Sequence, residues 1–290
     1  MTREEITAEV KSLAHKPWRL WGIQLRSIVA IETRRNLFSW RAAWVYFLAF
    51  APTFIVLMHY LFGGGNRRNE SISEDTMVLA GLFQFYYVRI GIFFGTLGIF
   101  TRLIRGEMVE RSLHYYLLSP VRREVLLLGK FVAGSLRALL LMGTAVVASF
   151  ILMYLPFGAA GQRYVFDGPG LSQLLSYMLI TALACMGYGA MFLLFSMLMK
   201  NPAPAALVLM GWEGISSIFP SVLQKFSITT YLRHLMPITV PGQGIFALLT
   251  VATEPVPAWL ATVGALTLTA AVLVLSCWRM RYLEISYTTE

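Results

Sequence analysis

Six long apolar runs divide this sequence of 290 residues, and they constrain its fold more than any other feature. An α-helix needs roughly 20 apolar residues to cross the hydrocarbon core of a bilayer, because each residue adds about 1.5 Å. The runs have this length and predict membrane spans at about residues 42–62, 77–104, 126–155, 171–199, 203–222 and 258–278. We therefore expect an all-α integral membrane protein with six transmembrane helices.

The composition agrees with burial in lipid. Hydrophobic residues make up 57% of the chain and charged residues only 13%, whereas soluble domains are about 25% charged. A water-soluble fold of this composition would expose large apolar patches. Residues 1–41 are polar and mixed, so we expect a cytoplasmic N-terminal segment followed by one six-span domain over residues 42–290.

Lysine and arginine are unevenly distributed between the loops. Seventeen of the 24 lie in residues 1–41, in residues 102–130, at Lys200 and after the sixth run, whereas five lie in the alternate loops. Loops rich in these residues stay in the cytoplasm. The pattern predicts two cytoplasmic termini and a bacterial-type inner membrane. It also accounts for the net charge of +9 without a nucleic-acid partner.

Two further segments are apolar without forming a continuous span. In residues 18–41, Trp18, Trp21, Leu25, Ile28 and Val29 recur at helical spacing. This pattern predicts an amphipathic helix in the inner membrane interface, or alternatively an ordinary cytoplasmic packing helix.

Residues 226–250 are apolar but broken by Pro237, Pro241 and Gly242. Irregular backbone at membrane depth must be covered by protein. We therefore expect short re-entrant helices in the outer leaflet before the sixth span.

A charged, amphipathic segment, at about residues 106–118, separates the second and third runs. Its polar residues fall on one face of a helix: Glu107, Glu110, Arg111 and His114. Its apolar residues fall on the opposite face: Val109, Leu113, Tyr116 and Leu117. Such a helix, held below the membrane by two long spans, could dock a cytoplasmic partner and transmit force to the spans. A solvated loop is the alternative.

The residues after this segment predict the start of another helix. Ser119 and Pro120 are typical of an N-cap followed by the first helical position. A helix from Pro120 to Tyr154 would be about 50 Å long, which exceeds the roughly 30 Å of hydrocarbon. We expect its first turns to project into the cytoplasm.

The run EMVERSLHYYLLSPVRREVLLLGK resembles the signature segment of the type-2 ABC (ATP-binding cassette) exporter permeases. The matching residues are Glu107, Glu110, Leu113, Leu117, Ser119, Pro120, Val121, Arg122, Gly129 and Lys130. Arg111-Ser112 replaces the Gly-Thr of that family, and His114 replaces a frequent Glu. The order of the predicted elements resembles the family over the whole chain.

The resemblance implies that residues 106–118 are the coupling helix, which seats in a groove of a nucleotide-binding ATPase subunit. It implies a second permease copy or a homologous permease, and ATP-driven export of an unidentified substrate. ATP and Mg would bind the partner ATPase, and no cofactor is expected on this chain. In agreement, Gly129-Lys130 lacks the upstream glycine of a phosphate-binding loop.

Three charged residues lie within the apolar runs: Arg89, Arg137 and Glu213. A carboxylate at membrane depth is costly, so Glu213 requires a partner charge, a cavity or a subunit interface. Arg89 and Arg137 are the candidate partners. Both a structural role and a position in the translocation path remain open for Glu213.

An ion-coupled secondary transporter is the main alternative. Such proteins usually carry internal repeats and carboxylates near the membrane midplane, whereas this sequence has no convincing repeat and one clear midplane acid. An aquaporin-like channel is disfavoured because its Asn-Pro-Ala triplet occurs once, at Asn201, beside a cytoplasmic turn. The four histidines are scattered, and no spacing indicates a metal site or a catalytic nucleophile.

Overall fold

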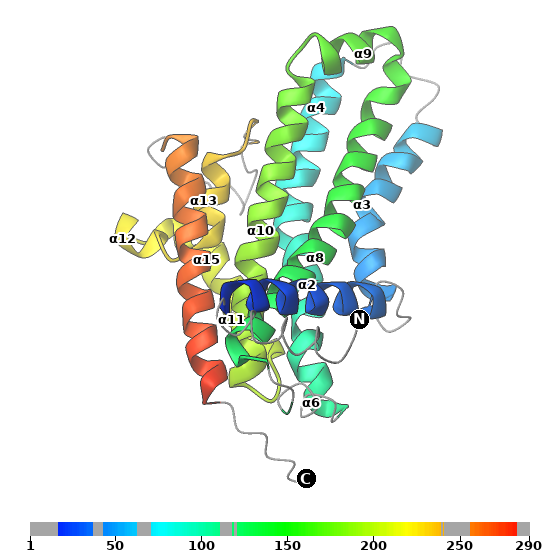
Figure 1. Cartoon of the computed structure of the whole chain (residues 1–290). Helices are drawn as coiled ribbons and strands as arrows, with labels where there is room; N and C mark the ends of the chain where they lie inside the picture. The colour runs from blue at the N-terminus through cyan, green and yellow to red at the C-terminus, as the bar shows by residue number, and fades with distance from the viewer. Residues whose placement is uncertain are drawn as a thin grey trace.

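The computed structural model of the chain describes residues 17–36, 43–62, 71–110, 118, 121–238, 240 and 256–282. All regular secondary structure in these residues is helical, and most helices run side by side as a bundle (Figure 1). Five helical stretches in the described residues are long and apolar enough to cross a membrane: Ala43–Phe62, Ile72–Val109, Arg123–Phe157, Gly170–Leu198 and Ala258–Arg281. The first and last of these are the single helices α3 and α15.

The second stretch is longer and less regular than its sequence predicts. It extends beyond the expected residues 77–104 at both ends. It consists of five consecutive pieces: α4 (Ile72–Gly81), η2 (Leu82–Gly91), α5 (Ile92–Thr101), η3 (Arg102–Gly106) and α6 (Glu107–Val109). The pieces η2 and η3 are π-helical, so their backbone makes wider turns than an α-helix. Apolar periodicity gives no indication of such turns.

The third stretch contains the longest continuous α-helix of the described residues, α8 (Arg123–Tyr154). Its 32 residues span about 48 Å, as expected from the sequence. It begins three residues after Pro120, because the backbone at Arg122 is still extended, with φ −65° and ψ 137°. A short turn, η4 (Leu155–Phe157), follows it.

After η4 the chain turns back at the upper end of the bundle in Figure 1. There α9 (Ala159–Phe166) connects to the fourth stretch, α10 (Gly170–Leu198). The opposite, lower end holds α6, the start of α8 and the end of α15 (Figure 1).

The predicted fifth span, residues 203–222, is not a continuous helix. The chain instead forms four short pieces: α11 (Ala203–Ile215), η5 (Ser216–Ile218), α12 (Ser221–Gln224) and α13 (Ile228–His234). The 13 residues of α11 reach only about 20 Å. Phe219 is extended before Pro220, as the ring of a following proline requires. The structure therefore has five stretches of membrane-spanning length, and the six-span layout is not confirmed.

The broken segment still extends along the bundle. In Figure 1, α11 lies toward the lower end, and α13 lies higher and beside α15. The short helix α13 lies in residues 226–250, where we expected re-entrant helices. Residue 239 and residues 241–250 of that predicted region lie outside the described part of the chain.

The N-terminal helix α2 (Pro17–Asn36) lies across the bundle rather than along it (Figure 1). It packs against the first turns of α8. The guanidinium of Arg122 lies 4.6 Å from the centroid of the Trp21 ring, and Ile28 lies so close to Gly129 that a Cβ there would approach it to 2.8 Å. Trp18 and Ile23 are exposed, as expected of an interfacial helix.

The core of the bundle lies between α5, α8 and α10. Phe100 of α5 fills the space between Gly134 of α8 and Gly189 of α10, where added Cβ atoms would approach its ring to 2.8 Å and 2.4 Å. Small residues at such positions allow helices in a membrane to approach closely. These contacts fix α5, and therefore the adjoining η3, against the neighbouring helices.

Candidate functional site

A buried ion-pair cluster joins three elements at the lower end of the bundle. Lys130 of α8 is 0% exposed, and its Nζ lies 2.5 Å from Glu32 Oε1 and 2.7 Å from Glu107 Oε1. Glu32 belongs to α2 and Glu107 to α6. Burying charges costs several kcal/mol per ion unless their partners are well placed. This triad, Glu32–Glu107–Lys130, therefore depends on all three elements keeping their positions.

Two residues of the sequence motif are members of this triad. Glu107 begins the predicted docking face, and Lys130 ends the quoted signature run. Glu32 was not singled out from the sequence. Its only signal is its position four residues after Ile28 on the face of α2 that packs on α8, where an acidic residue needs a partner.

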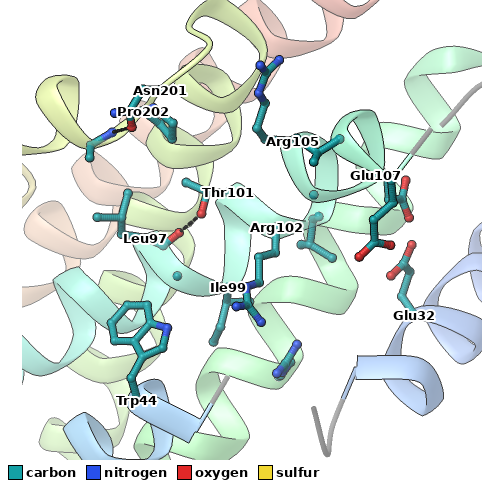
Figure 2. A pocket seen from close by; sticks show the side chains of 17 residues that line it. Glu32, Trp44, Leu97, Ile99, Thr101, Arg102, Arg105, Glu107, Asn201 and Pro202 are labelled. Carbon is teal, nitrogen blue, oxygen red and sulfur yellow. Dashed lines mark hydrogen bonds between the residues drawn. The ribbon is translucent and has the colours of Figure 1, made fainter. Parts of the chain in front are cut away.

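A cavity of about 630 Å³ lies beside the triad. Arg102 and Arg105 of η3 line it, together with Trp44 of α3 and Arg137 of α8. Figure 2 shows Arg102 directed toward the side of the cavity that holds Ile99 and Trp44, whereas Arg105 points the other way. Glu32 and Glu107 face each other at one edge (Figure 2). The cavity is thus lined by both guanidinium groups and apolar side chains.

Arg137 is the most deeply buried charged residue of this cavity apart from the two triad glutamates. It is 8% exposed, and its Nε is buried without a hydrogen-bond partner. Within the described part of the chain, Arg137 makes no hydrogen bond or ion pair. A buried guanidinium without an acceptor is unfavourable, so this side chain has unused binding capacity directed at the cavity.

Glu213 of α11 is 6% exposed and binds the start of α13. Its Oε1 accepts the Ile228 N–H at 3.0 Å, and its Oε2 accepts the Thr229 N–H at 2.9 Å and the Ser227 hydroxyl at 2.7 Å. The first N–H groups of any helix lack partners within the helix and favour a negative charge. Glu213 therefore holds together the two halves of the broken segment.

The two partners expected for Glu213 lie in different places. Arg89 of η2 is close enough to attract Glu213 electrostatically, as is Arg233 of α13. Arg137 instead lines the large cavity. Among the described residues, no lysine or arginine forms an ion pair with Glu213 within 4.0 Å. The carboxylate instead makes hydrogen bonds to the start of α13.

A second, smaller cavity of about 100 Å³ lies at this break. Arg89, Tyr188, Glu213 and Thr229 line it, and Tyr188 and Thr229 share a hydrogen bond of 3.0 Å between their hydroxyls. Ionisable groups at membrane depth commonly mark functional positions. Arginines from the π-helical pieces of the second stretch thus line both cavities.

The predicted docking segment is described only at its ends. Glu107 is buried in the triad, and Glu110 is exposed at the border of the large cavity. Residues 107–109 continue the second stretch instead of starting a separate helix. Five predicted site residues lie outside the described residues: Arg111, Leu113, His114, Tyr116 and Leu117. Their helix stays a prediction.

The described residues contain no group of three or more His, Cys, Asp or Glu residues that could hold a metal ion. In comparisons with known proteins, residues 27–279 match the family model described as ABC-2 family transporter protein. No curated protein matches the chain. The matched range includes the triad and both cavities.

Proposed function

The chain belongs to the ABC-2 family of transporter membrane proteins, and from this we propose that it is the permease subunit of an ATP-driven exporter that works with a separate ATPase. The match over residues 27–279, which is most of the chain, carries this proposal. The protein is accordingly a multi-pass membrane protein and an ABC transporter permease. The use of ATP as the energy source, the direction of transport and the assembly with other subunits are proposed.

The position of the triad supports a role in transmitting ATPase movement. Glu107 lies within residues 106–118, which we propose as the docking helix, and Lys130 lies shortly after them on α8. A displacement of the docking helix would reach α8 through this ion pair and α2 through Glu32. Packed elements with fixed contacts move as units.

The permease would act with a second copy or with a homologous permease. One chain supplies five long stretches and one broken segment, and we propose that the translocation path is completed between two permeases. ATP and Mg would bind the two partner ATPases. The ATPases would attach at the lower end of the bundle in Figure 1, where α6 ends.

Isolation from native membranes tests this assembly. We expect an affinity-tagged chain to co-purify with an ATPase subunit and to support ATP-dependent transport only in that complex. Full transport by the chain alone, with no ATPase present, would contradict the proposal. Dependence of that transport on a proton or sodium gradient would identify an ion-coupled secondary transporter instead.

The first prediction concerns the apolar face of the docking helix. Replacement of Leu117 or Tyr116 by alanine should weaken ATPase binding, because truncation of a buried interface anchor commonly costs about 2 kcal/mol or more. Pull-down of the ATPase, and the amount of permease in the same membranes, are the two measurements. The permease level should not change.

Two substitutions serve as controls for this prediction. Arg111→Gly, which introduces the family residue, should be tolerated, and so should Leu118→Ala, which removes an exposed leucine next to the predicted face. Loss of the Leu117→Ala permease from the membrane would mean that the face packs on its own spans. Unchanged ATPase binding and coupling would mean that the segment is a solvated loop.

The second prediction concerns sidedness. The lower end of the bundle in Figure 1 holds most of the described lysines and arginines, for example Lys130, Lys200 and Arg281, so we propose that it faces the cytoplasm together with both termini, in a bacterial-type inner membrane. Cysteine at Gln162 of α9 should react from outside with a membrane-impermeant thiol reagent, and cysteine at Glu110 should not.

Both positions are exposed, so that access rather than burial decides the labelling. The half-buried Cys277 is first replaced by alanine to remove a competing thiol. Permeabilised cells, in which both sites should react, provide the control. Labelling of position 110 in intact cells would reverse the orientation and remove the docking role.

A further inference from the structure

The large cavity has features of a ligand site that neither the triad nor the docking segment explains. Its volume of about 630 Å³ lies within the roughly 300–1,000 Å³ of typical small-molecule sites. It lies between the second stretch, α3, α8 and the start of α11. The described residues that line it allow its chemistry to be considered residue by residue.

Arg137 is the decisive residue. It is more than nine-tenths buried, it lines the cavity, and its Nε has no hydrogen-bond partner. A guanidinium pairs best with a carboxylate or phosphate, whose oxygens match its planar set of donors. Arg102, exposed on the same cavity, provides a second guanidinium.

The acidic residues of the cavity do not cancel this positive charge. Among the described residues, three arginines and three glutamates line it, but two of these glutamates, Glu32 and Glu107, are paired with Lys130. Counted over these described residues with Lys130 included, the charge is positive by one. The N-terminal end of α11 at Ala203 also borders the cavity, and the dipole of this helix favours a negative charge there.

The remaining lining is mainly apolar. Trp44 is 45% exposed and lies over Gly98, where an added Cβ would approach its ring to 2.3 Å. Leu97 and Ile99 border the same space. In Figure 2 the Trp44 ring lies across the cavity from Glu32 and Glu107. A ligand that contacts both the guanidinium groups and these apolar side chains must combine an anionic group with an apolar part.

We propose that this cavity binds an anionic amphiphile, with its phosphate or carboxylate held by Arg137 and Arg102 and its apolar part packed against Trp44 and Leu97. As an assignment of the transported substrate class, it rests on the proposed permease function. As an assignment of a binding site, it can be tested without the ATPase.

The test measures binding to the purified full-length chain in a nonionic detergent, without ATP or ATPase. Octyl phosphate is the probe, because it has one phosphate and one apolar chain, and isothermal calorimetry gives its Kd. Inorganic phosphate tests the anion alone, and the zwitterionic dihexanoyl phosphatidylcholine tests a lipid without net charge. We expect octyl phosphate to bind more tightly than either.

Substitutions locate the site. Arg137→Gln should weaken octyl phosphate binding about tenfold or more, because it removes a charge-assisted hydrogen-bonding pair. Trp44→Ala should weaken octyl phosphate binding but not phosphate binding. Arg163→Gln, which changes an exposed arginine of α9, is the matched control and should bind normally. Arg102→Gln tests the same site if Arg137→Gln does not fold.

Unchanged octyl phosphate binding in both Arg137→Gln and Arg102→Gln would overturn the proposal. So would equally tight binding of phosphatidylcholine. Inorganic phosphate that binds as tightly as octyl phosphate, with no effect of Trp44→Ala, would identify a simple anion site and also overturn it. In each case, ATPase pull-down with the same variants separates failure of this site from failure of the permease assignment.

Discussion

Replacement of Lys130 by methionine is expected to remove most of the folded protein from the membrane. Methionine keeps the length of the side chain but removes the ammonium group that binds Glu32 and Glu107 in the triad. The two buried carboxylates then lose the cation that lies between them. Breaking a buried ion pair in this way typically costs about 3–5 kcal/mol. Permease abundance in membranes and thermal stability in detergent are the measurements.

The other members of the triad provide the internal test. In the triple variant Lys130→Met, Glu32→Gln and Glu107→Gln, the triad positions carry no charge, so most of the lost abundance should return. Lys200→Met changes an exposed lysine at the same end of the bundle and should have little effect. If Lys130→Met is as abundant as the unchanged protein, the triad is not needed to hold α2, α6 and α8 together.

Replacement of Glu213 by alanine should have an effect of similar size for a different reason. It removes the acceptor of the Ile228 and Thr229 N–H groups and of the Ser227 hydroxyl. Each buried group left without a partner costs about 1–3 kcal/mol. We expect α13 to detach from α11, with a lower midpoint of thermal unfolding and loss of transport.

Glutamine at position 213 distinguishes hydrogen bonding from charge. Its single carbonyl oxygen can accept on one side, but its amide group faces donors on the other side, so Glu213→Gln should be milder than Glu213→Ala but not neutral. Arg137→Gln should not rescue it, because Arg137 lies at the other cavity. Rescue by Arg137→Gln would instead favour an ion pair, and normal assembly and transport in Glu213→Ala would refute both interpretations.

Sequence patterns predicted the long helices well, because the length of an apolar run is a direct requirement of the bilayer. The failure at residues 203–222 has a local cause. The mean hydropathy of that run is high, but Pro220 forces an extended residue before it, and α11 ends at Ile215. A window that averages over 20 residues does not register a single proline.

The sites were less accessible from the sequence. Glu213 and Arg137 stood out because charge within apolar runs is rare, yet the partners of Glu213 could not be derived, since they lie at the start of a separate helix, 14 to 16 residues further along the chain. Ser227 and Glu32 gave no signal of their own: a serine and a glutamate are ordinary residues in polar segments. The docking face, including Leu117, stays a prediction.

The π-helical pieces of the second stretch determine how the side chains after them are rotated about the helix axis, as well as where they lie along it. Each residue of an α-helix advances the rotation about the axis by about 100°, and a π turn accommodates one residue more. Side chains after η3 therefore have a different azimuth from the one that an unbroken α-helix would give them. If residues 102–106 adopted regular α-helical turns instead, Glu107 would be rotated away from Lys130 by up to about 100°, although every charge would remain. The rotational phase of this helix, and not only its composition, thus decides whether its end at α6 connects to the rest of the bundle.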